Sequence, residues 1–239
     1  MTTQSELTQS IDAAFNALYL AGSGYQLSGR QYHGTIQGRR VDAYYKRPMR
    51  GRHGRGGTTN SLTIYLSARL NVRLFVGAKV PSEDEWVLRL FHRSMMTVED
   101  PAYDHLSVSA PDEIWARDLL ADRAAKPAIL RLSTPLHGEG RRLLLEPRAL
   151  HTELWAFDSF AETTLQQIVD DLFVVAEAGE GILPPHQTAT ESVFERYLRD
   201  RGRFAWYGLG GCLLAGCALF ACSILCSAVP MFLDFLRSH

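Results

Sequence analysis

Cysteine is missing from most of this chain. The 239-residue sequence has four cysteines, and all of them fall in one short stretch, at Cys212, Cys217, Cys222 and Cys226. The preceding residues therefore cannot form a disulfide framework, which suits a fold made in a reducing compartment. At helical spacing the four cysteines scatter around the axis instead of sharing one face, so we expect them to bind no metal.

An excess of charge of either sign is also missing. The 25 lysines and arginines nearly balance the 26 aspartates and glutamates, for a net charge of −1, which argues against a dedicated nucleic-acid-binding protein. Such balance leaves proteins, lipids and small molecules as the favoured partner classes.

Recognisable catalytic motifs are absent as well. The eight histidines show no H-E-x-x-H spacing, and no G-x-S-x-G nucleophile turn occurs, so we expect no metal and no cofactor. Asp100, Asp104 and His105 form the one local group that could serve as acid and base. In a turn, such residues are more often solvated than catalytic, so an enzyme is not the favoured class, although a site assembled from distant residues leaves no sequence motif.

A long charge-free stretch, residues 204–233, is the most prominent feature that is present. A bilayer core needs about 20 consecutive apolar residues at helical rise, and this stretch exceeds that length. A buried core helix is usually shorter and keeps a polar stripe. Trp206 and Tyr207 fall where an interfacial aromatic belt is expected. The stretch predicts a single transmembrane helix.

Arginines beside this stretch predict its orientation. Four of them precede it, whereas Arg237 alone follows it, so the positive-inside rule places the large N-terminal part in the cytoplasm, at the inner membrane. The first ten residues are polar, so we expect no cleaved secretory signal and a tail-anchored, single-pass layout. The four preceding arginines are Arg196, Arg199, Arg201 and Arg203.

Small residues fall on one side of the predicted membrane helix. This spacing permits close approach of a second helix, from a membrane-protein partner or from another copy of the chain. Because small residues are common in membrane helices, a plain tether is the alternative. The candidate contact residues are Gly208, Gly211, Cys212, Ala215 and Gly216.

The first part of the chain has the periodicity of helix and then of strands. Thr3 and Glu6 have capping-box spacing, and a helical apolar period follows until Gly22 and Gly24. From Tyr25 to Val80 the period is two, with Gln37-Gly38 as a hairpin turn. One alternating series runs through Leu62, Ile64, Leu66, Ala68, Leu70, Val72, Leu74 and Val76.

The second part repeats the order of strands followed by a helix. Residues 82–93 fit either a helix or a strand, residues 103–109 predict a strand, and residues 111–125 predict a helix that Lys126-Pro127 ends. Three short strands are expected at 128–134, 141–147 and 149–155. A last helix is expected from the capping box of Ser159 and Glu162 to Gly179.

These patterns together predict an α+β domain, an antiparallel sheet with helices packed on one face. It occupies residues 1–180. A linker rich in Gly and Pro follows at 181–190, and a juxtamembrane and transmembrane helix is expected at 191–239.

Basic residues cluster around an expected loop between two strands. Gly51, Gly56 and Thr58 approach the phosphate-binding G-x4-G-K-[ST] pattern, but Gly57 replaces the lysine and a strand follows, so that match is rejected. Contact with anionic lipid headgroups is one interpretation, RNA is less favoured, and a solvated loop is the alternative. The basic residues are Arg39, Arg40, Lys46, Arg47, Arg50, Arg52 and Arg55.

The stretch AYDHLSVSAPDEIWARDLL, with GTIQGRRVDAY upstream, resembles uncharacterised bacterial proteins that join an α+β domain to a membrane helix. This resemblance implies no particular activity. The sequence favours a membrane-tethered, non-catalytic interaction or accessory (scaffold) subunit of a membrane protein complex. A lipid- or small-ligand-binding domain at the inner membrane surface is the alternative, and an unrecognised hydrolase is the third hypothesis.

Overall fold

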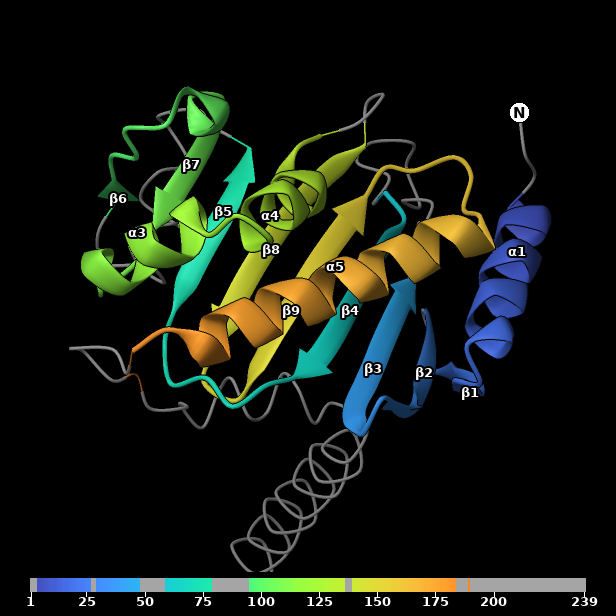
Figure 1. Cartoon of the computed structure of the whole chain (residues 1–239). Helices are drawn as coiled ribbons and strands as arrows, with labels where there is room; N and C mark the ends of the chain where they lie inside the picture. The colour runs from blue at the N-terminus through green and yellow to red at the C-terminus, as the bar shows by residue number, and fades with distance from the viewer. Residues whose placement is uncertain are drawn as a thin grey trace, which may run out of the picture. The chain divides into compact units, whose positions relative to one another are not determined.

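The computed structural model describes residues 4–26, 29–47, 59–78, 95–135, 139–183 and 189. Within them the fold is α+β (Figure 1), with a nine-stranded sheet in which each paired strand runs antiparallel to its neighbour, in the order β1-β2-β3-β4-β9-β8-β5-β7-β6. The strands are β1 Ala21–Gln26, β2 Gly29–Ile36, β3 Arg39–Lys46, β4 Ser61–Ser67, β5 Leu74–Ala78, β6 Met95–Met96, β7 Leu106–Ser109, β8 Gly140–Glu146 and β9 Ala149–Trp155. The helices are α1 Gln4–Ala17, the 3-10 turn η1 Pro101–Tyr103, α3 Glu113–Ala121, α4 Ala125–Ser133 and α5 Glu162–Gly181.

The predicted hairpin at Gln37-Gly38 is confirmed. Both residues have positive φ, 48° and 77°, the conformation that a two-residue turn between twisted strands requires. The turn pairs Ile36 with Arg39 and fixes the register of the whole β2–β3 ladder.

The hydrophobic core lies between the sheet and the helices that cross it. Figure 1 shows α4 and α5 lying across one face. On β4 the side chains of Leu62, Ile64 and Leu66 point to that face and are buried, because alternate residues of a strand face the same side. The expected α5 stripe belongs to the same hydrophobic core, and all its members are buried: Leu165, Ile168, Val169, Leu172, Phe173 and Ala176.

The alternating series from Leu62 to Val76 is two strands that are not neighbours. β4 and β5 are separated in the sheet by the β8–β9 hairpin, and residues 68–73 connect them without joining a strand. Backbone bonds from Ala68 N–H to the Arg148 carbonyl and from Arg148 N–H to the Leu70 carbonyl fasten this connection to the hairpin turn. All eight apolar residues of the series are buried, although they lie in two strands and the connection between them. The alternating pattern therefore indicates which residues are buried, and does not indicate a single continuous strand.

Two predicted helix boundaries were wrong. The first helix ends at Ala17, and Gly22 and Gly24 belong to β1. The last helix begins at Glu162 after Ala161, whose side chain makes no capping hydrogen bond, so the Ser159 and Glu162 capping box does not start it.

The prediction of a strand at 128–134 was also wrong, because these residues form most of α4. Lys126 and Pro127 do not end α3, which stops at Ala121, but lie in the first turn of α4, where proline is tolerated. Ala125, Ala128, Ile129 and Leu132 are all buried, at the spacing of one helix face.

None of the helices in the described ranges is long and apolar enough to cross a membrane. Residues 204–233, for which the transmembrane prediction was made, lie outside those ranges, as do residues 82–93.

Candidate functional site: a pocket between α4 and α5

The C-terminal end of α4 is fixed by three hydrogen bonds to its last carbonyls. The Leu130 carbonyl accepts from the N–H of Thr134 at 2.9 Å, and the Arg131 carbonyl accepts from Nη1 of Arg141 at 3.2 Å. The Leu132 carbonyl accepts from the Thr152 hydroxyl at 3.3 Å. Helix ends otherwise leave such carbonyls unsatisfied, and the bonds from Arg141 of β8 and Thr152 of β9 position α4 over these strands.

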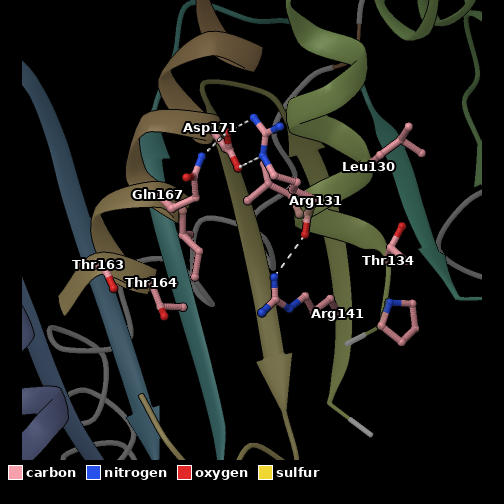
Figure 2. Close-up of a pocket in the computed structure, with 11 residues that line it drawn as sticks. Leu130, Arg131, Thr134, Arg141, Thr163, Thr164, Gln167 and Asp171 are labelled. Carbon is pink, nitrogen blue, oxygen red and sulfur yellow. Dashed lines mark hydrogen bonds and ion pairs between the residues drawn. The ribbon is translucent and has the colours of Figure 1, made fainter. Parts of the chain in front are cut away.

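A pocket of about 610 Å³ lies between this end of α4, the start of β8 and the first turns of α5. Figure 2 shows side chains from all three elements around it. Leu130, Leu132, Pro135 and Ile168 supply apolar lining. The volume is within the range of small-molecule sites, which combine an apolar lining with a few convergent polar groups.

An ion pair joins α4 to α5 at one side of the pocket. Arg131 binds Asp171 through two hydrogen bonds, from Nε to Oδ2 at 3.0 Å and from Nη2 to Oδ1 at 2.6 Å. Gln167 donates to the same Oδ1 at 3.2 Å. The Asp171 side chain is only 4% exposed, so its charge needs this partner. Hydrogen bonding to Asp171 raises the pKa of Arg131, which keeps the guanidinium charged.

Arg141 of β8 lies on the other side of the pocket. Its Nη2 pairs with Oε2 of Glu139 at 3.0 Å, while Nη1 holds the α4 carbonyl. Its Nε is buried and has no hydrogen-bond partner. The side chain is 13% exposed, and Figure 2 shows it reaching from β8 toward Arg131.

Three threonine hydroxyls complete the polar lining. Thr163 and Thr164 come from the first turn of α5, and Thr134 comes from the end of α4. Thr134 Oγ1 lies 3.1 Å from Nε2 of His105, an exposed residue just before β7.

Asp100, Asp104 and His105, the local group that could serve as acid and base, have separate roles in the structure. Asp100 caps η1 through the Ala102 N–H at 3.0 Å and pairs with Lys126. The Lys126 ammonium and the Ala102 N–H together hold the pKa of Asp100 below its ordinary value. Asp104 is the C-cap residue of η1. Asp100 and His105 therefore bind different partners, Lys126 and Thr134.

The described part of the predicted basic set is divided between the two ends of β3. Arg39 and Lys46 are the first and last residues of this strand, which puts them about 23 Å apart at about 3.3 Å per residue. Arg39 binds Glu180 of α5 through two bonds of 2.6 and 2.8 Å. Arg40 pairs with buried Asp42 at 2.7 Å. Lys46 is exposed and Arg47 is half-buried.

The remaining predicted contact residues lie outside the described ranges. They are Arg50, Arg52, Arg55, Gly208, Gly211, Cys212, Ala215 and Gly216. Among the residues that the structure does describe, no three His, Cys, Asp or Glu side chains are grouped so as to hold a metal ion.

Sequence reasoning missed the pocket because it assigned Leu130, Arg131 and Thr134 to a strand. The helical spacing of Ala125, Ala128, Ile129 and Leu132 was the signal that would have placed Arg131 on an outward helix face. No sequence pattern links Arg131 with Asp171, 40 residues further along. Comparisons with protein-family models, curated proteins and solved structures gave no match to this chain.

Proposed function

We propose that this protein is a membrane-tethered, non-catalytic binding module whose α+β domain takes up a small ligand between α4 and α5. The observation that carries the proposal is the pocket of about 610 Å³, which is lined by two arginines, three threonines, a glutamine and an aspartate beside apolar side chains. Such a combination is typical of ligand sites.

Binding is favoured over catalysis because the charged groups of the pocket are engaged with one another. Arg131 and Asp171 form one ion pair, and Arg141 and Glu139 form another. A general acid or base must be able to exchange a proton with its substrate. A carboxylate held by a bidentate guanidinium is poorly suited to that task.

The tether in this proposal is the apolar stretch 204–233, which holds the domain at the cytoplasmic face of the inner membrane. Its support is the length of the charge-free stretch and the arginines before it. Protease added outside sealed cells should leave the sites at Arg50, Arg52 and Arg55 intact. Cleavage there would place the domain on the other side of the membrane.

An accessory role on another membrane protein, or on a second copy of the chain, is the second part of the proposal. The small-residue face Gly208, Cys212 and Gly216 supports it. Gly216→Leu should stay in the membrane fraction but lose a crosslinked partner, because the larger side chain separates the two helices. Leu213→Ile is the matched control and should lose nothing. Equal crosslinking of both variants would leave the stretch as a plain tether.

Contact with anionic lipid is proposed for fewer residues than the sequence predicted. Arg39 and Arg40 are engaged with Glu180 and Asp42, so the proposal keeps exposed Lys46 together with Arg50, Arg52 and Arg55, which lie outside the described ranges. Each cation near an anionic leaflet contributes about 1 kcal/mol.

Ligand binding can be tested by thermal denaturation of the full-length protein in mild detergent. A panel of carboxylates, phosphates, amino acids and sugars should contain compounds that raise the midpoint, because a ligand that binds the folded state stabilises it. Thr164 is half-buried in the first turn of α5, and Thr164→Trp should fill the pocket and abolish the increase. An increase that survives this substitution would place the ligand elsewhere, and a panel without any effect would count against the proposal.

A further inference from the structure

We propose that two copies of this chain associate through the outer edge of β1, with Gly22 at the centre of an antiparallel strand pair and Tyr19 at each of its ends. This surface does not involve the α4–α5 pocket or the small-residue face of the apolar stretch 204–233. The inference therefore goes beyond the proposed ligand site and gives a second copy of the chain a contact on the folded domain.

The place of Gly22 in the sheet leaves its backbone groups at an open edge. β1 is the end strand and pairs only with β2 (Figure 1). Ile36 and Arg39 flank a two-residue turn and form a hydrogen-bonded pair, so every second residue back from Ile36, including Tyr32, bonds to β3. Gly22, which lies opposite Tyr32, therefore directs its N–H and C=O away from β2. Gly22 is exposed, and no residue in the described ranges forms a hydrogen bond to these outward groups.

Tyr19 is an exposed aromatic residue in a backbone conformation that favours glycine. It follows the end of α1, where its N–H donates to the Asn16 carbonyl and the N–H of Leu20 donates to the Phe15 carbonyl, each at 3.0 Å. Glycine is the usual residue at this point of a helix end because φ is positive, and Tyr19 has a φ of 58°. Tyr19 is 94% exposed, so packing within the domain does not offset this strain. Contact of its ring with a partner would offset it.

A second copy of β1 satisfies the open edge by two-fold symmetry. With Gly22 opposite Gly22, each N–H donates to the C=O of the other copy, because opposed residues of a hydrogen-bonded antiparallel pair exchange both bonds. β1 has no charged residue, and nearby Asp12 and Arg30 form an ion pair with each other, so like charges do not hold two copies apart. Tyr19, three residues before Gly22, then lies at both ends of the strand pair.

The two edges of the sheet differ, which makes this association closed. In the described ranges β6, the strand at the other edge, consists of Met95 and Met96 and is too short to continue a sheet. Pairing of β1 with β1 therefore gives a dimer and not a filament. The register shift between Ser23 and Gln26 confines the contact to the start of β1. Such a contact is smaller than the roughly 1,200 Å² of stable interfaces, so we expect association at the concentrations reached in a membrane and little in dilute solution.

The test is disulfide crosslinking of full-length Gly22→Cys in native membranes. The Cα atoms of an opposed hydrogen-bonded pair lie about 5.5 Å apart, which is within the range that a disulfide spans. A Cβ atom at this position would lie 3.4 Å from Nε of Arg30 and 3.5 Å from the Tyr32 ring, ordinary contacts that the fold accepts. We expect a product of twice the chain mass. Thr35→Cys, at an exposed residue of β2 away from the edge, is the matched control and should not exceed the background that the native cysteines give in the wild-type protein.

Tyr19→Gly, made in the Gly22→Cys background, separates a contact role of Tyr19 from a structural one. Glycine relieves the cost of the positive φ, so the thermal midpoint should rise. The rate of crosslinking should nevertheless fall by about fivefold or more, as expected when an aromatic anchor is removed from an interface. A residue that served only the stability of the domain would not produce these opposite changes.

Each alternative has its own outcome. Crosslinking of Gly22→Cys no stronger than that of Thr35→Cys would refute the pairing, and an unchanged rate with Tyr19→Gly would refute the contact assigned to Tyr19. A product of another mass would show that a different protein occupies the edge. Loss of the product in a Gly216→Leu background would assign the association to residues 204–233. A chain absent from the membrane fraction would contradict the proposed tether alone, and the same crosslink would then test the dimer at high protein concentration.

Discussion

At the scale of single residues, Gly140 has a steric reason to be glycine. A Cβ atom added there would lie 1.8 Å from Cε2 of the Trp155 ring, its cross-strand partner. Gly140→Ala should therefore force the indole or the start of β8 to move, next to Arg141. We expect a loss of about 1–3 kcal/mol in the free energy of unfolding, measured by urea denaturation, as for other overpacked sites.

Gly181 is the control for that substitution. An added Cβ there meets nothing within 4 Å, and the residue ends α5. Because alanine favours a helix more than glycine does, Gly181→Ala should be neutral or stabilising by up to about 1 kcal/mol. Equal destabilisation by both substitutions would mean that the contact between Gly140 and Trp155 is not the cause.

Glu180 makes the stability of the domain depend on pH. The Arg39 guanidinium, aided by the N–H of Arg69 at 2.7 Å, holds the pKa of this carboxyl below its ordinary value. A depressed folded-state pKa stabilises the protein above the ordinary glutamate pKa of about 4.3, and this contribution is lost as pH falls through the folded-state value.

Glu180→Gln should therefore cost about 1 kcal/mol at neutral pH, a modest figure because the pair is partly solvated. The difference from the wild-type protein should disappear in acid. Urea denaturation of both proteins across the acidic range measures it. A constant difference at every pH would show that the charge of Glu180 is not what matters.

At the scale of elements, α4 decides whether the pocket exists. In the helix Ile129 is buried and Leu130 is half-buried, whereas a strand would put Leu130 on the same face as the buried Ala128 and Leu132. We expect Ile129→Ala to cost about 2–5 kcal/mol and Leu130→Ala about 1 kcal/mol or less. Urea denaturation measures both costs. A larger cost for Leu130→Ala than for Ile129→Ala would favour a strand at these residues and contradict the helix.

Local sequence patterns gave most of the elements but not their arrangement. The β2–β3 hairpin was predictable because two residues at a turn define its register. The α5 stripe was predictable because it repeats over several turns. Alternation from Leu62 to Val76 could not reveal that the β8–β9 hairpin inserts between β4 and β5, since strand pairing depends on residues far apart in the chain.

The candidate site was less predictable than the fold for the same reason. Arg131, Arg141 and Asp171 come from three elements, and their pairing follows from tertiary packing. The basic set around β3 shows the opposite case, in which residues close in the sequence lie apart in the fold. Arg39 and Lys46 are the first and last residues of the eight-residue strand β3, and Arg39 binds Glu180 of α5.

At the scale of the whole molecule, the folded domain should be separable from the rest of the chain. α5 reaches Gly181, and the N–H of Ala189 binds the Asn71 carbonyl at 2.6 Å. A fragment of residues 1–190 should therefore be soluble and unfold cooperatively. A fragment that ends at residue 178 lacks Glu180 and Ile182 and should be less stable, as thermal denaturation can show. Equal stability of the two fragments would mean that this end of α5 contributes little.

The central claim, that the domain carries a small ligand between α4 and α5 while tethered to a membrane, is tested most directly by native mass spectrometry. The full-length protein and Thr164→Trp would be purified from membranes in mild detergent. The account predicts that the wild-type protein retains a bound small molecule whose mass is absent from the variant. The same bound mass on both proteins, or none on a wild-type protein that remains folded, would contradict it.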